Sequence, residues 1–102
     1  MKDPLEEVIA THPGILVVLF TGAGGAAEEA SRTAAREAAA ALPAADAPRF
    51  LEADLGCRRE AARRFGIHGA PAVALFREGR LLGKRLGACR REEILALATK
   101  PA

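Results

Sequence analysis

The stretch FGIHGAPAVALFREGRLLGKRLGA, residues 65–88, contains the strongest structural signals in this 102-residue chain. Two runs rich in apolar residues, AVALF at 72–76 and LLGKRLG at 81–87, are separated by the short turn REGR. Such an arrangement predicts a β-hairpin. Gly66 precedes it at a position typical of the end of a helix. The stretch therefore predicts a helix followed by two antiparallel strands.

Upstream of the hairpin, the apolar run ILVVLF at 15–20 is bounded by glycines on both sides. A continuous apolar run of this length is typical of a central strand that is buried on both faces. Before it, Asp3 and Pro4 fit the cap and first position of a short helix that ends before His12. The first strand is thus expected to be enclosed by the rest of the domain.

The segment from about Ala26 to Leu42 consists mostly of strong helix formers, begins with acidic residues in its first turn and stops at Pro43. Its buried face is predicted to be Ala30, Ala34, Ala38 and Leu42. The other predicted elements are a loop at 44–48, a strand at 49–55 parallel to the first, a short helix at 57–66 and a last helix at 91–99. This order predicts an α/β protein with one domain over residues 1–102 and a sheet of about four strands, covered by helices on both faces.

Composition limits the function classes. The net charge is only +2, from 15 basic and 13 acidic residues, so nucleic-acid binding is not expected. We expect the arginines at 58, 59, 63 and 64 to form a solvated face. The N-terminus is acidic and the apolar run is too short to cross a bilayer, which predicts a cytoplasmic protein without a membrane span. Cys57 and Cys89 are the two cysteines, and their spacing in the sequence is not that of metal ligands. We therefore expect no metal site and no cofactor.

Residues 65–88 resemble the C-terminal half of thioredoxin-fold proteins, in which an aromatic-Gly-Ile sequence leads to a proline, a hairpin and a Gly-Ala pair. The resemblance implies a βαβαββα core preceded by a short N-terminal helix. It also implies a cis peptide bond before Pro71, which would leave the preceding backbone N–H and C=O free to pair with an extended peptide.

The resemblance places the first strand where thioredoxins lead into their two redox cysteines. Gly24 then takes the place of the nucleophilic cysteine and Ala27 that of the resolving one. Val18 stands where thioredoxins have a buried acid, and Ala23 where they have a tryptophan. Dithiol exchange needs an activated thiolate and a second thiol, so the resemblance implies a fold that has lost this activity.

The two cysteines that are present offer an alternative function. In this topology Cys57 follows the strand at 49–55 and Cys89 follows the last strand, so about three strand spacings of roughly 4.8 Å separate them. That is about 14 Å, and a disulfide needs Cα atoms within about 7 Å. We therefore expect two free thiols. The alternative is a thiol-disulfide oxidoreductase that uses Cys57 or Cys89 by itself.

The segment EADLGCRREAARRFGIHGAPAV, residues 52–73, is similar to the thioredoxin-like hydrogenase-expression proteins, which lack both active-site cysteines. In both, an Ala-Asp-Leu ends a strand and the same number of residues leads to Arg-Phe-Gly and the proline. The resemblance implies an accessory chaperone in maturation of nickel-iron hydrogenase. Its client would be the small-subunit precursor, held through its twin-arginine signal region.

Taken together, the residues predict a protein-binding module and no enzyme. Three loops should converge at one edge of the sheet and contact an extended segment of a protein partner. The predicted contact residues are Gly24, Gly25, Ala26 and Ala27 in the first loop, His68, Gly69, Ala70 and Pro71 in the second, and Gly87 and Ala88 in the third.

Overall fold

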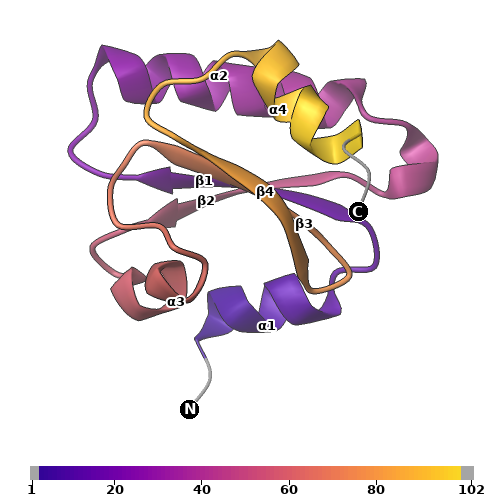
Figure 1. Ribbon diagram of the computed structural model, residues 1–102, viewed down its shortest axis with the longest axis horizontal. Helices are drawn as coiled ribbons and strands as arrows, with labels where there is room; N and C mark the ends of the chain where they lie inside the picture. Colours follow the sequence, from indigo (N-terminus) through magenta and orange to yellow (C-terminus); the bar gives the residue numbers. More distant parts are fainter. Residues whose placement is uncertain (1–2, 100–102) are drawn as a thin grey trace.

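A four-stranded mixed sheet forms the centre of the computed structural model, which describes residues 3–99 (Figure 1). Its strand order is β2-β1-β3-β4, with β1 at Ile15–Thr21, β2 at Arg49–Asp54, β3 at Ala72–Arg77 and β4 at Arg80–Leu86. β1 runs parallel to β2 and antiparallel to β3, and β3 and β4 form the predicted hairpin. The predicted mixed sheet is confirmed.

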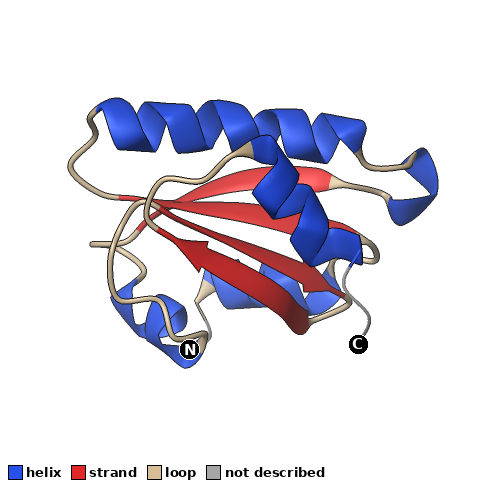
Figure 2. Cartoon of the chain, turned by 45° about the horizontal axis from the view of Figure 1, so that its top comes forward, coloured by secondary structure: helices blue, strands red, loops and turns tan. Residues whose placement is uncertain are grey.

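Helices cover both faces of this sheet (Figures 1 and 2). On one face lie α2 (Ala26–Ala41) and α4 (Arg91–Thr99), and on the other lie α1 (Pro4–Thr11) and α3 (Arg59–Arg64). As predicted, the Asp3 side chain caps α1 by accepting a hydrogen bond from the backbone N–H of Leu5 at 2.8 Å. None of the helices described over residues 3–99 has the length and apolarity needed to span a membrane.

The apolar run of β1 is explained by its burial on both sides. Ile15 through Phe20 are all almost completely inaccessible to solvent. Because successive side chains of a strand point to opposite faces, Leu16, Val18 and Phe20 pack toward α1 and α3, whereas Ile15, Val17 and Leu19 pack toward α2 and α4. The single strand β1 therefore contributes to both hydrophobic cores.

Two local predictions were wrong. On α2 the predicted Ala34 and Ala38 are buried, together with Glu28, Ser31, Ala35 and Ala39, whereas Ala30 is exposed and Leu42 is only partly buried. Ala30 lies beside the segment that leads into α4, not over the sheet. The loop at 44–48 contains a short 3-10 helix, η1, at Ala44–Asp46.

The strand directions bring several loops to one edge of the sheet. Phe20 near the end of β1 is opposite Ala72 at the start of β3, and Ala72 is opposite Leu86 at the end of β4. The loops that follow β1, precede β3 and follow β4 therefore leave the sheet side by side, on the left in Figure 1.

Candidate functional site

Three loops contact one another at this edge. The backbone N–H of Gly87 donates a hydrogen bond to the carbonyl of Pro71 at 2.8 Å. Gly22 lies so close to the second loop that a Cβ atom placed on it would be 3.0 Å from the Cβ of Ala70. Of the predicted contact residues, Pro71 and Gly87 are thus in direct contact, whereas the first loop meets Ala70 through Gly22, just before the predicted Gly24–Ala27. We call the surface made by residues 22–27, 68–71 and 86–88 the loop surface.

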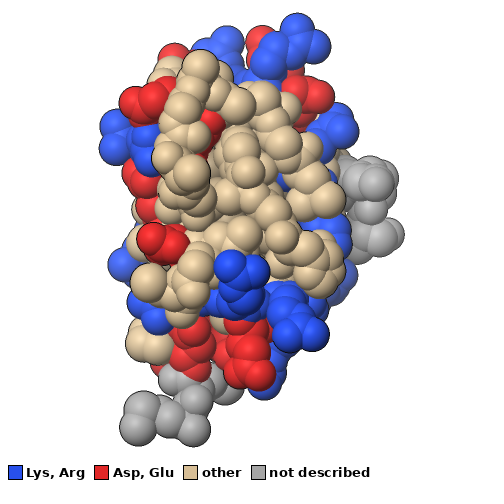
Figure 3. Space-filling model, turned by 90° about the vertical axis from the view of Figure 1, so that its left-hand side faces the viewer, with Lys and Arg blue, Asp and Glu red and all other residues tan. Residues whose placement is uncertain are grey.

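The loop surface is exposed and carries no charged side chain. Its residues are all exposed apart from Pro71, which is half-buried. Leu86, at the end of β4, is 60% exposed, and Leu81 is the other large hydrophobic residue that is exposed within residues 3–99. Figure 3 shows this side as a broad uncharged area with Lys and Arg side chains along its lower border. Exposed apolar area of this kind is a feature of binding surfaces.

The peptide bond between Ala70 and Pro71 is cis, as the resemblance implied. Within the described part of the chain, neither the N–H nor the C=O of Ala70 has a hydrogen-bond partner. Ala70 is exposed, so both groups can be reached from solvent. The loop surface therefore presents one donor and one acceptor of the main chain beside apolar side chains.

The junction between β1 and α2 has a backbone that suits glycine. Gly24 and Gly25 have φ angles of +89° and +102°, in a region that L side chains rarely adopt. The helix begins only at Ala26. Gly24, which the resemblance assigns to the position of the nucleophilic cysteine, lies two residues before the helix, and its φ angle is one that residues with a side chain rarely adopt.

Glu28 holds this junction to α2. Its carboxylate is buried and accepts a hydrogen bond from the backbone N–H of Gly22 at 2.6 Å. The other carboxylate oxygen lies 3.5 Å from the guanidinium of Arg32, which also contacts Glu29 and donates to Glu52 of β2 at 3.0 Å. Sequence reasoning identified Glu28 only as an acid in the first turn, because its contact with Gly22 depends on how the loop folds back.

Val18 occupies the position that the resemblance assigns to the buried acid of thioredoxins. Val18 is fully buried in the core between the sheet and the helices α1 and α3. Of residues 3–99, the buried ones that are polar or charged are Glu28 and Ser31, both on α2. No group of three His, Cys, Asp or Glu side chains that could hold a metal ion occurs in the same range.

Both cysteines are free thiols, as predicted. Cys57 is exposed in the turn after β2, and Cys89 is buried in the segment before α4. β2 and β4 are the two outer strands of the sheet, so the thiols follow strands at opposite sides of the sheet. The strand-spacing argument against a disulfide therefore holds.

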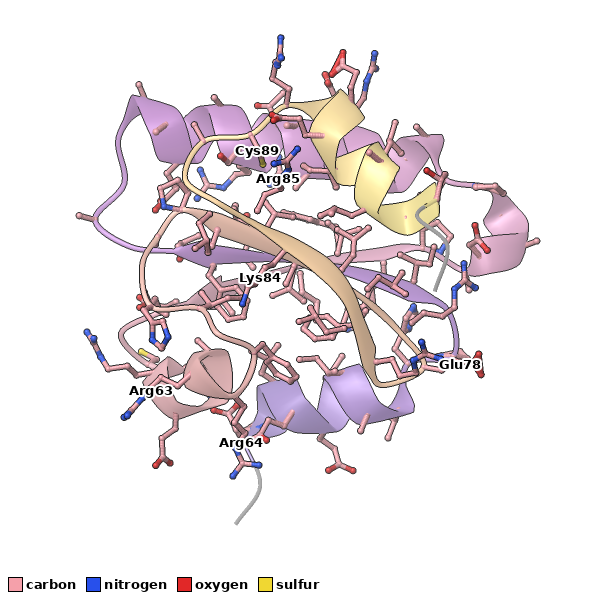
Figure 4. All side chains as sticks on the ribbon, viewed as in Figure 1. Arg63, Arg64, Glu78, Lys84, Arg85 and Cys89 are labelled. Atoms are coloured by element: carbon pink, nitrogen blue, oxygen red, sulfur yellow. The ribbon has the colours of Figure 1, made fainter. Side chains whose placement is uncertain are left out.

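Cys89 lies against α2, as Figure 4 shows. Its backbone N–H lies 3.4 Å from the hydroxyl of Ser31, and its side chain borders a hollow of about 500 Å³ between α2 and α4. Burial raises the pKa of the Cys89 thiol, and the Ser31 hydrogen bond only partly opposes this. Because the thiolate is the reactive form, this burial disfavours a role of Cys89 as a nucleophile.

Comparisons with known proteins identify the fold. No family model and no curated protein sequence matches the chain. Among solved structures, a thioredoxin mutant from Halobacterium salinarum is 13% identical, with a TM-score of 0.75 over 100% of this chain and 88% of that chain. Mitochondrial thioredoxin 3 from Saccharomyces cerevisiae is 19% identical, with a TM-score of 0.73 over 94% of this chain and 87% of that chain.

A designed protein is also similar, at 21% identity and a TM-score of 0.73 over 92% of this chain and 80% of that chain. At these levels of identity the likeness concerns the fold, and function has to be argued from the site. With the observed strand order, the cis proline and these likenesses together, the chain has the thioredoxin-like α/β fold.

Proposed function

We propose that this protein is a binding module that holds an extended segment of a protein partner on the loop surface and performs no dithiol chemistry. One observation carries the proposal: an exposed, uncharged surface surrounds Ala70, whose N–H and C=O have no partner in residues 3–99. An extended peptide can satisfy both groups by adding main-chain hydrogen bonds, as in β-augmentation.

The rest of the loop surface suits this kind of ligand. Leu86 and Pro71 offer apolar contact next to Ala70. Gly24 and Gly25 have open space around them, with no atom within 4 Å of a placed Cβ. A surface of small residues lets a second backbone approach closely, so that affinity comes from main-chain pairing and from a few apolar side chains.

The alternative, thiol-disulfide exchange by one cysteine, has support at Cys57 rather than Cys89. Cys57 is exposed, whereas Cys89 is buried and its pKa is raised. A lone exposed thiol can form a mixed disulfide, but release of the product then requires another thiol to attack it. Neither Gly24 nor Ala27 supplies one, which favours binding over turnover.

The client in this proposal is the one that the sequence resemblance implies, the small-subunit precursor of a nickel-iron hydrogenase. Its support is the spacing from Asp54 to Pro71, which is similar to that of the hydrogenase-expression proteins. The proposal requires that the signal region of such a precursor bind in an extended conformation.

Two measurements test the module. Random peptides displayed on phage are selected on the wild type and on Leu86→Asp, and the wild type should retain peptides that the variant loses. Leu81→Asp, which alters the other exposed leucine, should retain them. Failure to enrich any peptide on the wild type overturns the proposal.

Insulin-disulfide reduction tests the alternative. The wild type, Cys57→Ser and Cys89→Ser are expected to show no catalysed reduction. Turnover by the wild type that is lost in either variant would establish the thiol function in place of the binding function. A synthetic peptide of the host's hydrogenase signal region, titrated by fluorescence anisotropy, separately tests the proposed client.

A further inference from the structure

A small groove adjoins the loop surface where α3 and the following loop meet. Its volume is about 230 Å³, and it is lined by Leu55, Arg59, Arg63, Ile67 and His68. Leu55 and Ile67 are buried and form an apolar floor, whereas the two arginines and His68 are exposed around it. We call this the arginine groove. His68 belongs both to the groove and to the loop surface, so the two are continuous.

The arginines at 58, 59, 63 and 64, which were predicted to form a solvated face, fall into two pairs in and next to α3. Arg58 lies 3.3 Å from the carboxylate of Asp3, and Arg64 lies 3.0 Å from that of Glu6. Both acids come from the N-terminal part of the chain, at the cap and first turn of α1. These two arginines therefore help to attach α3 to α1, and they do not line the groove. Figure 4 shows Arg63 and Arg64 extending from α3 away from the sheet.

Arg59 and Arg63 have no such partner. Among the described residues, no carboxylate lies within 4.0 Å of either guanidinium, including that of Glu60, the one acid of α3. Like charges four residues apart on a helix destabilise it by a few tenths of a kcal/mol. Nearby Lys84 is already engaged, because its ammonium donates to the carbonyl of Phe65 at 2.9 Å. Glu60 lines a neighbouring hollow with Arg63 and Arg64, so an acid is near but makes no ion pair with either groove arginine. The groove thus holds two cations that are not in contact with a carboxylate of the described chain.

We propose that the segment bound on the loop surface places an acidic side chain in the arginine groove, between Arg59 and Arg63. This rests on the proposed binding module, not on the proposed hydrogenase client, and it specifies the chemistry of the ligand. His68 precedes Ala70 by two residues, a span of at most about 7 Å. A ligand residue two positions from the one paired with Ala70 therefore reaches the groove, since an extended strand advances about 3.3 Å per residue.

The chemistry of the groove fits a carboxylate on a short aliphatic stem. Guanidinium groups bind carboxylates with charge-assisted, often bidentate hydrogen bonds, and the floor of Leu55 and Ile67 suits the methylene groups of Glu or Asp. An oligonucleotide is a poorer match. Single-stranded nucleic acid is held by a charged track with aromatic platforms. Two arginines flank this groove, His68 is the one ring that lines it, and the chain has no Trp or Tyr.

The test uses the displayed peptides selected on the wild-type protein. Among them, Asp or Glu should be enriched at one fixed position relative to the apolar residues. The affinity of the best synthetic peptide is then measured for the wild type, Arg59→Ala, Arg63→Ala and Arg80→Ala. Arg80 is an exposed arginine at the start of β4, at the opposite end of that strand from Leu86, and it controls for the loss of one positive charge.

Arg59→Ala and Arg63→Ala should each weaken binding about tenfold, as for loss of a hydrogen bond to a charged group, whereas Arg80→Ala should change it less than twofold. Replacing the acidic residue of the peptide by its amide should weaken binding to the wild type by the same factor. The same replacement should weaken binding to Arg63→Ala much less. Added salt should reduce the difference between acid and amide peptides.

The two proposals fail in different ways. One outcome is that the selected peptides bind the wild type and not Leu86→Asp, yet show no preference for an acidic residue. That result overturns the proposal that the arginine groove binds an acid, and it leaves the proposed binding module intact. Enrichment of paired arginines, in place of an acid, at the peptide position expected in the groove also overturns the proposal for the groove. It would favour the hydrogenase precursor with its twin-arginine signal region as the client. Tighter binding of a single-stranded oligonucleotide than of the acidic peptide also overturns the inference.

Discussion

The carboxylate of Glu28 accepts the backbone N–H of Gly22 at 2.6 Å, across the junction between β1 and α2. Glu28 is 6% exposed, and its second oxygen faces Arg32. A buried charge of this kind is stable only when it is paired and hydrogen-bonded. The contact therefore holds the glycine-rich loop against the first turn of the helix, and the shape of the loop surface depends on it.

Glu28→Ala is expected to lower the free energy of unfolding by about 1.5–3 kcal/mol, as for loss of a hydrogen bond to a charged group. The amide proton of Gly22 should then exchange faster with solvent, because it has lost its acceptor. Urea unfolding and hydrogen exchange followed by NMR measure the two effects. Glu28→Gln retains an acceptor oxygen, so its free energy of unfolding and its Gly22 exchange rate should lie between those of the wild type and Glu28→Ala. Unchanged exchange at Gly22 in Glu28→Ala would show that the contact is not formed in solution.

Gly25→Ala should destabilise the protein by about 1–3 kcal/mol, because Gly25 has a φ angle of +102° that alanine adopts only under strain. Gly69→Ala provides the matched control on the same surface. Gly69 does not have a positive φ angle, and no atom lies within 4 Å of its placed Cβ. Its substitution should change stability by less than about 0.5 kcal/mol. If urea unfolding shows the same loss of stability for Gly25→Ala and Gly69→Ala, the positive φ angle of Gly25 is contradicted.

Leu86→Ser should reduce peptide binding without a matching loss of stability. Leu86 is 60% exposed, so its contribution to folding should be within about 0.5 kcal/mol. Thermal or urea unfolding and peptide titration give the two quantities on the same sample. Leu81→Ser is the control, since Leu81 lies on the same strand away from the loop surface. A loss of binding by both variants alike would indicate a general loss of structure.

Cys89 should make stability fall at alkaline pH. Burial raises the pKa of its thiol in the folded state above the ordinary value, so the folded protein binds the proton more tightly than the unfolded chain does. The resulting stabilisation is present in full below about pH 8.5, the ordinary pKa of a thiol, and is lost as the pH rises through the folded-state pKa.

Unfolding free energies measured across this pH range should therefore decline less steeply for Cys89→Ala than for the wild type. Cys57→Ala, which replaces the exposed cysteine, is measured beside it as the control for the substitution itself. The same burial predicts that a thiol reagent modifies Cys57 rapidly and Cys89 only slowly in the native protein. Equal modification rates for the two cysteines would contradict the buried position of Cys89.

Much of the fold follows from local patterns in the chain. The run ILVVLF predicted a buried central strand, Asp3 and Pro4 predicted the start of α1, and the turn REGR predicted the hairpin, all of which the structure contains. Periodicity alone placed Ala30 on the buried face of α2. It is exposed because the sheet contacts the neighbouring alanines at 34, 35, 38 and 39.

The candidate site was predictable only in part. The convergence of the three loops follows from topology, so Gly24, Ala70 and Gly87 could be placed at one edge from the sequence. The arginine groove could not be predicted, since four arginines of similar spacing look alike in the sequence. Which of them acquire carboxylate partners depends on α1, a helix some 50 residues earlier in the chain, and on how it packs against α3.

The sequence by itself determined the order of the elements, the absence of sulfur at positions 24 and 27 and the glycines that permit left-handed backbone, because these depend on residue type and near neighbours. Only the tertiary structure decided that Glu28 is buried against Gly22 and that, in the described chain, no carboxylate lies within 4.0 Å of the guanidinium of Arg59 or Arg63. Burial and ion pairing are set by groups that are distant along the chain, so they appear only once the helices have packed on the sheet.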